Sequence, residues 1–257
     1  MTTQLPYSLQ DPASEPVNLG LIVLQVDETI ESDFRRLMPA KGVRVLHSRI
    51  PSPDAITPET LLEMGKALPQ SASLFPPQAS LPVIAYACTS GTAAMGEAHV
   101  AKQVRKGYPG VEVTNPLSAL KAALAALELR RVALVSPYMK AVSDDTCARL
   151  EEGGATVCRV GSFNQTADRL VARIDPGSVL EAAVTMGADS DSDGVVISCT
   201  ALPAVEILAE AERRIGKPVL ASNQALAWHM LRLAGIEGVQ PQMGALGKAG
   251  LRLREAV

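Results

Sequence analysis

A strand-like apolar run that ends in Cys-Thr occurs twice in this chain. The first copy is VIAYACTSGT, from Val83 to Thr92, and the second is GVVISCTALP, from Gly194 to Pro203. Each is apolar and β-branched up to the cysteine and changes to a helical pattern after it. This order is typical of parallel α/β sheets, in which a helix follows each strand. We therefore expect Cys88 and Cys199 at carboxyl ends of strands and amino ends of helices.

The repeat extends beyond the two cysteines, which are 111 positions apart. The same offset brings GLIVLQVD, from Gly20, onto RVALVSPY, from Arg131, and so Asp27 onto Tyr138. It also brings Thr89 onto Thr200. A repeat of this length indicates two similar domains, because solenoid repeats are much shorter. The alternative is that two α/β units share strand and helix spacing by chance.

Strand-like and helix-like segments alternate along the chain, which predicts parallel sheets with right-handed crossovers. The Ala/Leu-rich helix after Asn115-Pro116 is expected to cross from one domain to the other. We predict one domain from residues 1–115 plus 217–257 and a second from residues 116–216. Residues 69–81, rich in Pro and Ser, are expected to form a loop or an irregular edge segment. Sites in such folds lie outside the carboxyl ends of the strands, where both cysteines fall.

Composition excludes several kinds of partner. The 257-residue chain has 47% hydrophobic and 20% charged residues, a net charge of −3 and no basic cluster, which argues against nucleic-acid binding. Residues 1–18 lack the features of a secretory signal. No apolar run approaches the ~20 residues of a membrane span. We therefore expect a cytoplasmic protein with reduced thiols and no membrane partner.

No pattern for a metal or cofactor stands out. The four cysteines and three histidines match no zinc motif. The acidic run Asp189–Asp193 lacks the spacing of a calcium-binding EF-hand, so we interpret it as a solvated turn. Neither a GxGxxG motif nor a Walker loop is present. The sequence predicts chemistry without a metal or a cofactor.

Two thiols at equivalent strand ends suggest acid/base chemistry on one small acid. A helix amino terminus can lower the pKa of a thiol, which then removes a proton or adds to a double bond. The residues that follow, Thr89, Ser90, Thr200 and Ala201, offer hydroxyl and backbone N–H groups to a carboxylate. The alternative is that both cysteines are inert core residues, as we expect for Cys147 and Cys158.

Asp27 and Tyr138 end the first strand of each half and should face the same cleft. Asp27 could instead be a loop cap, and Tyr138 a packing residue.

The chain resembles the aspartate/glutamate racemase superfamily, in the branch that holds maleate cis-trans isomerase and arylmalonate decarboxylase. The resemblance covers residues 19–235 and rests on GLIV at Gly20, CTSGT at Cys88, RVALVSPY at Arg131, the stretch Asn164–Pro176 and SDGVVISCT at Ser192. GLIVLQVDETIESDFR is closer still to ectoine-utilisation proteins. The resemblance implies two flavodoxin-like domains related by pseudo-two-fold symmetry, an active site at their interface, cofactor-independent chemistry and a dimer.

The resemblance also implies roles for individual residues. Cys88 would add to the substrate and Cys199 would supply the proton, as in maleate isomerases. Carboxylate binding would fall to Thr89, Ser90, Tyr138, Asn164, Thr200 and the backbone of Ala201. The decarboxylase has Gly at the first cysteine position, so two cysteines favour an isomerase or racemase over a decarboxylase.

One departure concerns the substrate. Maleate isomerases carry Asn after the first strand, whereas this chain reads LQVDET and has Asp27 there. An anion at this position would repel a second carboxylate and could pair with an amino group. We therefore hypothesise an amino acid or acylated diamino acid as substrate. A rival class is an intracellular sensor that binds a small acid between two lobes without turnover.

Overall fold

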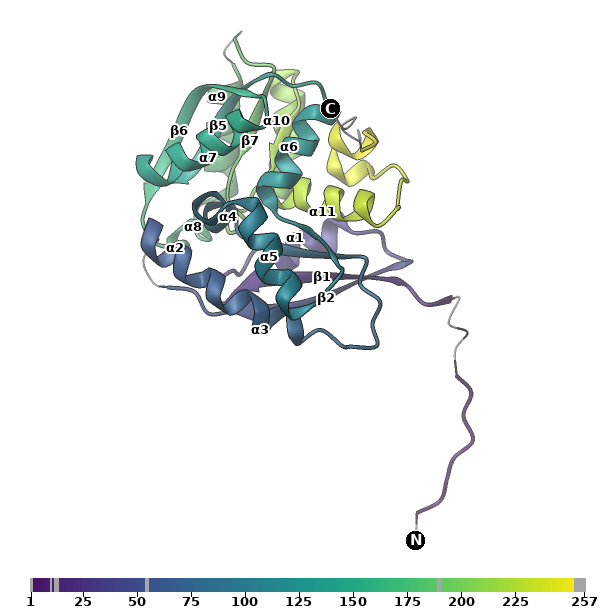
Figure 1. Ribbon diagram of the computed structural model, residues 1–257. Coiled ribbons are helices and arrows are strands. Elements are labelled where there is room, and N and C mark those ends of the chain that lie inside the picture. The colour runs from purple at the N-terminus through teal and green to yellow at the C-terminus, as the bar shows by residue number, and fades with distance from the viewer. Residues whose placement is uncertain (1, 10, 12–13, 54–55, 189–190, 252–257) are drawn as a thin grey trace, which may run out of the picture.

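Two four-stranded parallel sheets form the frame of the molecule (Figure 1). The computed structural model describes residues 2–9, 11, 14–53, 56–188 and 191–251. The first sheet, ordered β2-β1-β3-β4, contains β1 Val17–Leu24, β2 Val43–Ile50, β3 Val83–Ala87 and β4 Glu112–Thr114. The second, ordered β6-β5-β7-β8, contains β5 Arg131–Tyr138, β6 Thr156–Gln165, β7 Gly194–Ile197 and β8 Val219–Ala221. This shared order is flavodoxin-like. The predicted fold class is therefore confirmed.

Helices follow the strands in both halves. The first half contains α1 Ile30–Leu37, α2 Pro58–Met64, α3 Leu68–Ser73, α4 Thr89–Met95 and α5 Glu97–Gly107. After α6 Pro116–Ala126, the second half contains α7 Lys140–Glu152, α8 Asp168–Val171, α9 Pro176–Gly187 and α10 Leu208–Ile215, and α11 Ser222–Leu233 comes last. Short 3₁₀ turns lie at Gly65–Ala67, Val205–Ile207, Pro241–Met243 and Leu246–Lys248.

The strands are buried on both faces, which explains their continuous apolar runs. In β1, Leu21 and Val23 point into one core cluster and Ile22 and Leu24 into the other, as expected because successive strand side chains alternate. Each cluster contains residues of both sheets. The two halves therefore share their hydrophobic cores.

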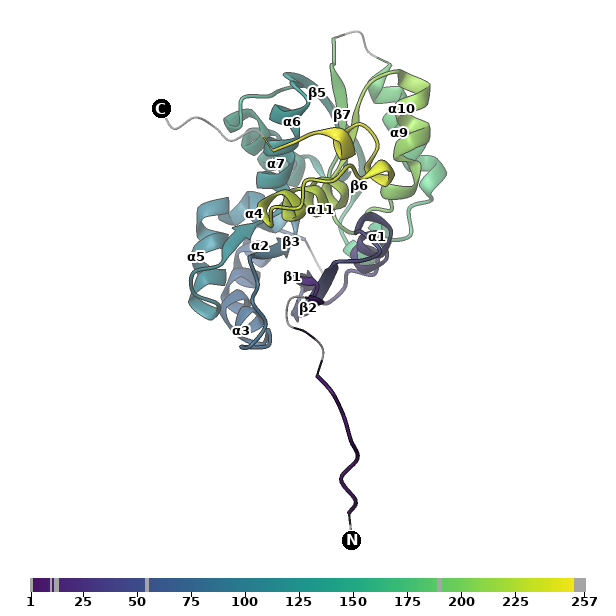
Figure 2. The ribbon, with the colours of Figure 1, turned by 90° about the vertical axis from the view of Figure 1, so that its right-hand side faces the viewer.

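Helix α6 connects the two sheets, as predicted. The Asn115 side chain accepts a hydrogen bond from the Ser118 N–H at 2.9 Å, and Pro116 occupies the first turn. Helix α11 lies across the boundary between the halves (Figure 2), where it contacts α6, α1 and β3. The predicted domain division placed residues 217–257 with the first half, but β8 within this segment pairs with β7 of the second sheet. The division itself stays a prediction.

Two local expectations are corrected. The helical pattern expected after Cys88 is divided into two helices, α4 and α5, because Gly96 has a φ of +82° that does not continue a helix. The loop expected over residues 69–81 contains α3. Pro69 stands in the first turn of this helix, where proline is tolerated, and Leu68 and Ala72 are buried.

The repeat register also needs a correction. Leu19 pairs with Val83 in the first sheet, whereas Val132 pairs with Gly194 in the second. The third strands are therefore offset by 111 residues but the first strands by 113. A difference of two residues preserves which face a side chain points to.

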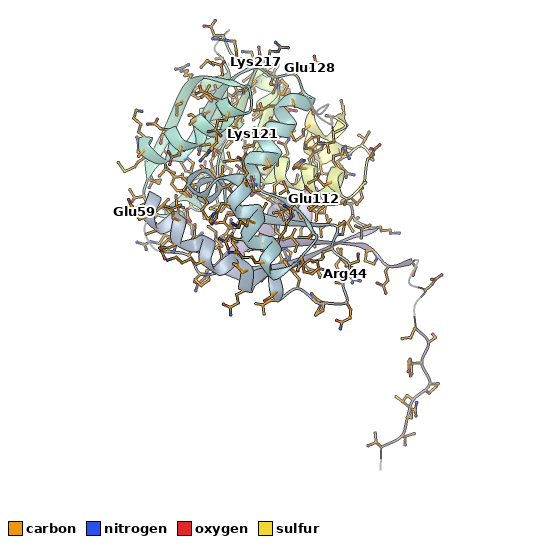
Figure 3. The ribbon with its side chains drawn as sticks, viewed as in Figure 1. Arg44, Glu59, Glu112, Lys121, Glu128 and Lys217 are labelled. Atoms are coloured by element: carbon orange, nitrogen blue, oxygen red, sulfur yellow. The ribbon has the colours of Figure 1, made fainter. Side chains whose placement is uncertain are left out.

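Charged side chains are distributed over both halves. Arg44 and Glu112 lie on the first half and Glu128 and Lys217 at the far end of the second (Figure 3). Lys121 in α6 forms an ion pair with Glu97 in α5 at 2.6 Å. Within the described ranges, no helix is long and apolar enough to cross a membrane.

Candidate active site

One small buried cavity lies where the carboxyl ends of the two sheets meet. Its volume is about 10 Å³, which is room for about one water molecule. Its walls come from both halves of the chain: Leu24, Asp27, Cys88, Thr89, Ser90, Tyr138, Asp168, Cys199, Thr200 and Ala201. Every site residue predicted from the sequence is in this set except Asn164. The folding of the chain therefore brings both thiols to one cavity.

Cys88 follows β3 and caps α4, as predicted. Its Sγ accepts a hydrogen bond from the Gly91 N–H at 3.2 Å and lies 3.7 Å from the Ser90 Oγ. Burial raises the pKa of the Cys88 thiol to about 11, and the charge of Asp168 adds to this rise. The expectation of a lowered pKa is therefore wrong for this structure, because desolvation of the thiolate outweighs the N–H donor.

Cys199 follows β7, as predicted. The expectation that it also lies at the amino end of a helix is wrong. Residues 198–204 form a loop, and the next helical turn starts only at Val205. Pro203 contributes, because proline disfavours helical backbone in the residue before it. The Cys199 backbone has a φ of +120°, and its N–H donates to the Ser222 Oγ at 3.1 Å. A non-glycine residue in this region is strained, and such strain is common at functional sites.

The Cys199 thiol lies against Tyr138. Its Sγ is 3.2 Å from the Tyr138 hydroxyl, and that hydroxyl donates to the Asp168 carboxylate. Burial first, and the charge of Asp168 second, raise the pKa of Cys199 well above its usual value. Cys199, Tyr138 and Asp168 thus form a hydrogen-bonded row along one wall.

Asp27 follows β1 and lines the cavity. Its Oδ1 accepts hydrogen bonds from the N–H groups of Thr29 at 2.8 Å and Ile30 at 2.9 Å. Its Oδ2 is buried and has no hydrogen-bond partner among the described residues. Burial raises the pKa of Asp27 to about 6. Asp27 is therefore a loop cap, which was the alternative to a role in the site, and it also lines the cavity.

Asp168 was missed by the sequence reasoning, which named Asn164 instead. Asn164 is exposed in β6, has a φ of +52° and does not line the cavity. Asp168 begins α8, is 5% exposed and has a pKa that burial raises. The signal that could have found it is the one used for Asp27, an acidic residue just beyond the end of a strand.

Hydrogen bonds between the halves hold the cavity together. Ser222, also missed, is fully buried, and its Oγ lies 2.9 Å from the Thr89 Oγ1 as well as accepting from the Cys199 N–H. The Thr200 Oγ1 donates to the Ala87 carbonyl at 3.3 Å, and the Thr29 Oγ1 donates to the Ala201 carbonyl at 2.8 Å. These contacts fix the residues after β3 against those after β7.

Tyr86 is a third residue that the sequence did not indicate. It is fully buried in β3, and its hydroxyl forms no hydrogen bond to an oxygen or nitrogen of the described residues. It lies close enough to the Cys88 sulfur to lower the pKa of that thiol. A Cβ added at Gly91 would lie 2.6 Å from this hydroxyl and 3.0 Å from the Cys88 Sγ. The Tyr86 hydroxyl and the Cys88 thiol therefore lie on the same side of α4.

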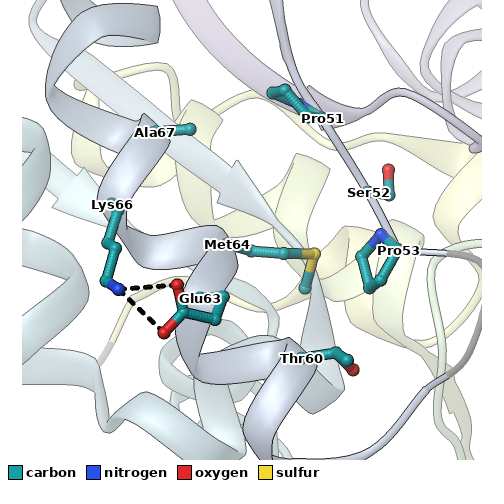
Figure 4. A pocket seen from close by; sticks show the side chains of 8 residues that line it. All are labelled: Pro51, Ser52, Pro53, Thr60, Glu63, Met64, Lys66 and Ala67. Carbon is teal, nitrogen blue, oxygen red and sulfur yellow. Dashed lines mark hydrogen bonds and ion pairs between the residues drawn. The ribbon is translucent and has the colours of Figure 1, made fainter.

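A larger pocket opens on the surface between α2 and the segment after β2 (Figure 4). Its volume is about 560 Å³, and it is lined by Pro51, Ser52, Pro53, Thr60, Glu63, Met64, Lys66 and Ala67. The Met64 side chain points across it toward Ser52 and Pro53, and its methyl group would lie 3.3 Å from a Cβ at Gly91. Met64 therefore stands between this pocket and Gly91 beside Cys88. The pocket itself contains no thiol.

The described part of the chain holds no group of three or more His, Cys, Asp or Glu side chains arranged to bind a metal. The polar groups of the residues that line the cavity are thiols, carboxyls, hydroxyls and backbone groups.

Comparisons with known proteins agree with this geometry. The profile of the family described as arylmalonate decarboxylase matches residues 94–247. A maleate isomerase of Nocardia farcinica is 31% identical over 238 residues, covering 89% of this chain and 94% of that protein. The arylmalonate decarboxylase of Bordetella bronchiseptica is 35% identical over 127 residues, covering 49% of this chain and 53% of that protein.

Solved structures of related proteins have a similar fold. A Nocardia farcinica maleate cis-trans isomerase, a cysteine-to-serine mutant with a covalently bound succinylcysteine intermediate, has a TM-score of 0.82 at 27% identity and covers 91% of this chain and 99% of its own. A liganded arylmalonate decarboxylase mutant, with glycine changed to cysteine and cysteine to serine, has a TM-score of 0.74 at 28% identity, covering 85% and 93%. The predicted resemblance and the prediction of an isomerase-type enzyme are confirmed. The link to ectoine utilisation stays a prediction.

Proposed function

Because this chain belongs to the arylmalonate decarboxylase family, we propose that it is a cofactor-independent isomerase or racemase acting on a small carboxylate through Cys88 and Cys199. One observation carries the proposal: the two thiols, from opposite halves of the molecule, line the same buried cavity. Residues that touch one substrate from two sides can remove a proton on one face and return it on the other.

The surroundings of Cys88 favour its role as the thiolate. Gly91 offers an N–H at 3.2 Å, Ser90 offers a hydroxyl, and the buried Tyr86 hydroxyl has no other hydrogen-bond partner among the described residues. Each of these groups can donate to a sulfur anion and would be better satisfied by it than by a thiol. Cys88 is therefore proposed as the base or nucleophile.

The surroundings of Cys199 favour its role as the acid. The Tyr138 hydroxyl donates its hydrogen bond to Asp168. Its oxygen can therefore accept a hydrogen bond from the Cys199 thiol, whose sulfur lies 3.2 Å away. A nearby carboxylate also opposes formation of a second anion. Cys199 is therefore proposed to hold a proton in the resting enzyme and to deliver it to the substrate.

Two reactions fit these roles. In a racemase, the Cys88 thiolate takes the proton from the carbon beside the carboxylate, and the Cys199 S–H proton goes to the opposite face. In a cis-trans isomerase, the Cys88 sulfur forms a C–S bond to a double-bonded carbon, while Cys199 protonates the neighbouring carbon. Rotation about the new single bond follows, and Cys199 takes a proton back as the C–S bond breaks. The succinylcysteine of the Nocardia relative supports the second route.

The substrate carboxylate is proposed to bind at the hydroxyl side of the cavity. Thr89, Ser90, Thr200, Tyr138 and the Ala201 backbone line it there. Oriented donors of this kind stabilise negative charge as it develops during deprotonation. Since the cavity holds only about one water, substrate binding has to enlarge it.

A decarboxylase is the alternative within the family. The related arylmalonate decarboxylase structures include mutants in which a glycine was changed to cysteine. Because this chain has cysteine on both sides of its cavity, isomerase chemistry is favoured. The sensor hypothesis is less favoured still, because nothing in simple binding requires two facing thiols.

The test is proton exchange in deuterated water. Small carboxylic acids are incubated with the enzyme, and loss of the proton signal beside the carboxylate is followed by NMR. We expect Cys88→Ser and Cys199→Ser each to reduce turnover at least 10²-fold, since each step needs a specific thiol. Cys147 is a half-buried thiol of α7 that does not line the cavity. The Cys147→Ser variant should therefore retain wild-type turnover. A fully active Cys88→Ser enzyme would exclude the two-thiol mechanism.

A further inference from the structure

Two carboxyl groups meet in the candidate active site without a basic side chain. Asp27 and Asp168 come from opposite halves and both line the cavity. They are 3% and 5% exposed, and each raises the pKa of Cys199 through its charge. None of the described residues around the cavity is Lys, Arg or His. A buried carboxylate normally has an ion-pair partner or is kept neutral.

The free oxygen of Asp27 marks where a partner is missing. Oδ1 accepts hydrogen bonds from the Thr29 and Ile30 N–H groups, while Oδ2 is buried and has no partner at hydrogen-bond distance among the described residues. The Thr200 side chain, which lines the cavity with Asp27, is close enough to lower the pKa of Asp27, but it brings no positive charge. Arg49 contacts Asp27 only through the Asp27 backbone carbonyl, at 3.2 Å, and forms its ion pair with Glu31. An unsatisfied buried acceptor costs about 1–3 kcal/mol, more when it is charged.

The geometry points to the missing partner. Resting on the proposed function, we propose that the substrate is a small amino acid whose ammonium group binds between the carboxylates of Asp27 and Asp168. An ammonium group has three N–H donors and one positive charge, which suit two carboxylates in a water-poor site. The carboxylate of the same substrate would bind at the hydroxyls of Thr89, Ser90 and Thr200.

A dicarboxylic acid fits this arrangement poorly. Its second carboxylate would face two fixed negative charges at low dielectric, where repulsion is strong. It would bind well only when Asp27 and Asp168 are protonated and can donate. The two substrate classes therefore predict opposite responses to neutralising these aspartates.

Binding of an ammonium group would also activate the thiols. The charge of Asp168 is the second cause, after burial, of the raised pKa of both Cys88 and Cys199. A cation beside Asp168 cancels that effect, so the Cys88 thiolate forms more easily once substrate is bound. It then takes the proton from the α-carbon, and Cys199 returns its own proton to the other face. The thiols, Tyr86, Tyr138 and the two aspartates are the titratable groups that take part.

The experiment uses pairs of acids that differ only in the ammonium group. Aspartate is compared with succinate, and 2-aminobutyrate with butyrate. Binding is measured by calorimetry on the Cys88→Ser variant at pH 8, and exchange by NMR on the wild-type enzyme in deuterated water. We expect the amino acid of each pair to bind at least tenfold more tightly, and exchange to be confined to amino acids.

Variants identify the groups responsible. Asp27→Asn and Asp168→Asn, each made in the Cys88→Ser background, should weaken amino-acid binding at least tenfold and strengthen succinate binding. Asp33→Asn is the matched control, because Asp33 is equally buried, has a pKa raised to about 6 by burial, and does not line the cavity. It should leave the preference for amino acids unchanged. Thermal unfolding checks that each variant is folded.

The outcomes separate this inference from the proposed function. The ammonium site is overturned if succinate binds more tightly than aspartate, or if none of the four acids binds. Exchange on succinate that requires both cysteines leaves the two-thiol mechanism standing while overturning this inference. Amino-acid binding that depends on Asp27, with no exchange in the wild-type enzyme, supports the ammonium site and overturns the proposed function.

Discussion

At the scale of single residues, the two thiols differ in backbone strain. Cys199 has a φ of +120°, a region that favours glycine, whereas Cys88 has a φ of −151°. We compare the free energies of unfolding of the Gly and Ala variants at each position. We predict that the change from Cys199→Ala to Cys199→Gly is more favourable than the change from Cys88→Ala to Cys88→Gly. The difference should be about 1–2 kcal/mol. Urea unfolding of the four variants measures it, and the same glycine penalty at both positions would show that Cys199 is not strained.

Asp27 gives a pH-dependent effect on stability. Burial raises its pKa from an ordinary value of 3.8 to about 6 in the folded protein, so the folded state favours the protonated carboxyl. Its contribution to stability is therefore greatest below pH 4 and is lost as the pH rises to about 6. Asp27→Asn should be more stable than wild type at pH 7.5, by at most about 3 kcal/mol, and the advantage should disappear near pH 4.

Asp193 provides the opposite control for this measurement. Hydrogen bonds from the Arg131 and Arg130 N–H groups lower its pKa. Asp193→Asn should therefore lose stability at neutral pH, and the loss should fade as the pH falls below 4. Melting temperatures from about pH 2.5 to 7.5 for both variants test the two signs. An Asp27→Asn variant that is less stable at pH 7.5 would contradict the raised pKa.

At the scale of elements, the first turn of α4 depends on a close approach. Gly91 donates its N–H to Cys88, and a Cβ there would meet the Tyr86 hydroxyl at 2.6 Å and the Cys88 Sγ at 3.0 Å. Gly91→Ala should cost about 1–3 kcal/mol of stability and should lower turnover by displacing the thiol. Gly238→Ala is the control, because its nearest described neighbour is 3.9 Å away. Equal stability of the two variants would mean that α4 adapts without cost.

At the scale of the whole molecule, the two halves should unfold as one unit. Both hydrophobic clusters contain residues of both sheets, and α11 packs against α6, α1 and β3. The single tryptophan, Trp228, is fully buried in α11 and reports on this shared core. We predict that its fluorescence and the far-ultraviolet circular dichroism change at the same urea concentration, as two-state unfolding requires. Separate transitions would show that the halves are independent. The dimer inferred from the family resemblance stays a prediction.

The sequence alone determined the local structure and the presence of the two thiols. The apolar run of β1, the Asn115-Pro116 start of α6 and the repeated Cys-Thr ends of β3 and β7 are short-range signals, which periodicity and capping chemistry express directly. They were sufficient to predict two parallel sheets, and together with the family resemblance they named nine site residues, of which eight line one cavity. They also identified Asp27 as a departure that bears on the substrate.

Only the tertiary structure decided how charge and burial act in the site. Asp168 and Ser222 lie far along the chain from both thiols, so the local sequence does not show that they lie beside them. Tyr86 is only two positions from Cys88, but the strand pattern does not show that its hydroxyl lies beside the thiol. Burial reversed the expected direction of the thiol pKa, because desolvation depends on every element packed around Cys88 and Cys199 and not on the helix end beside them. The strain at Cys199 likewise arises from a loop conformation that Ser222 helps to hold from the neighbouring strand end.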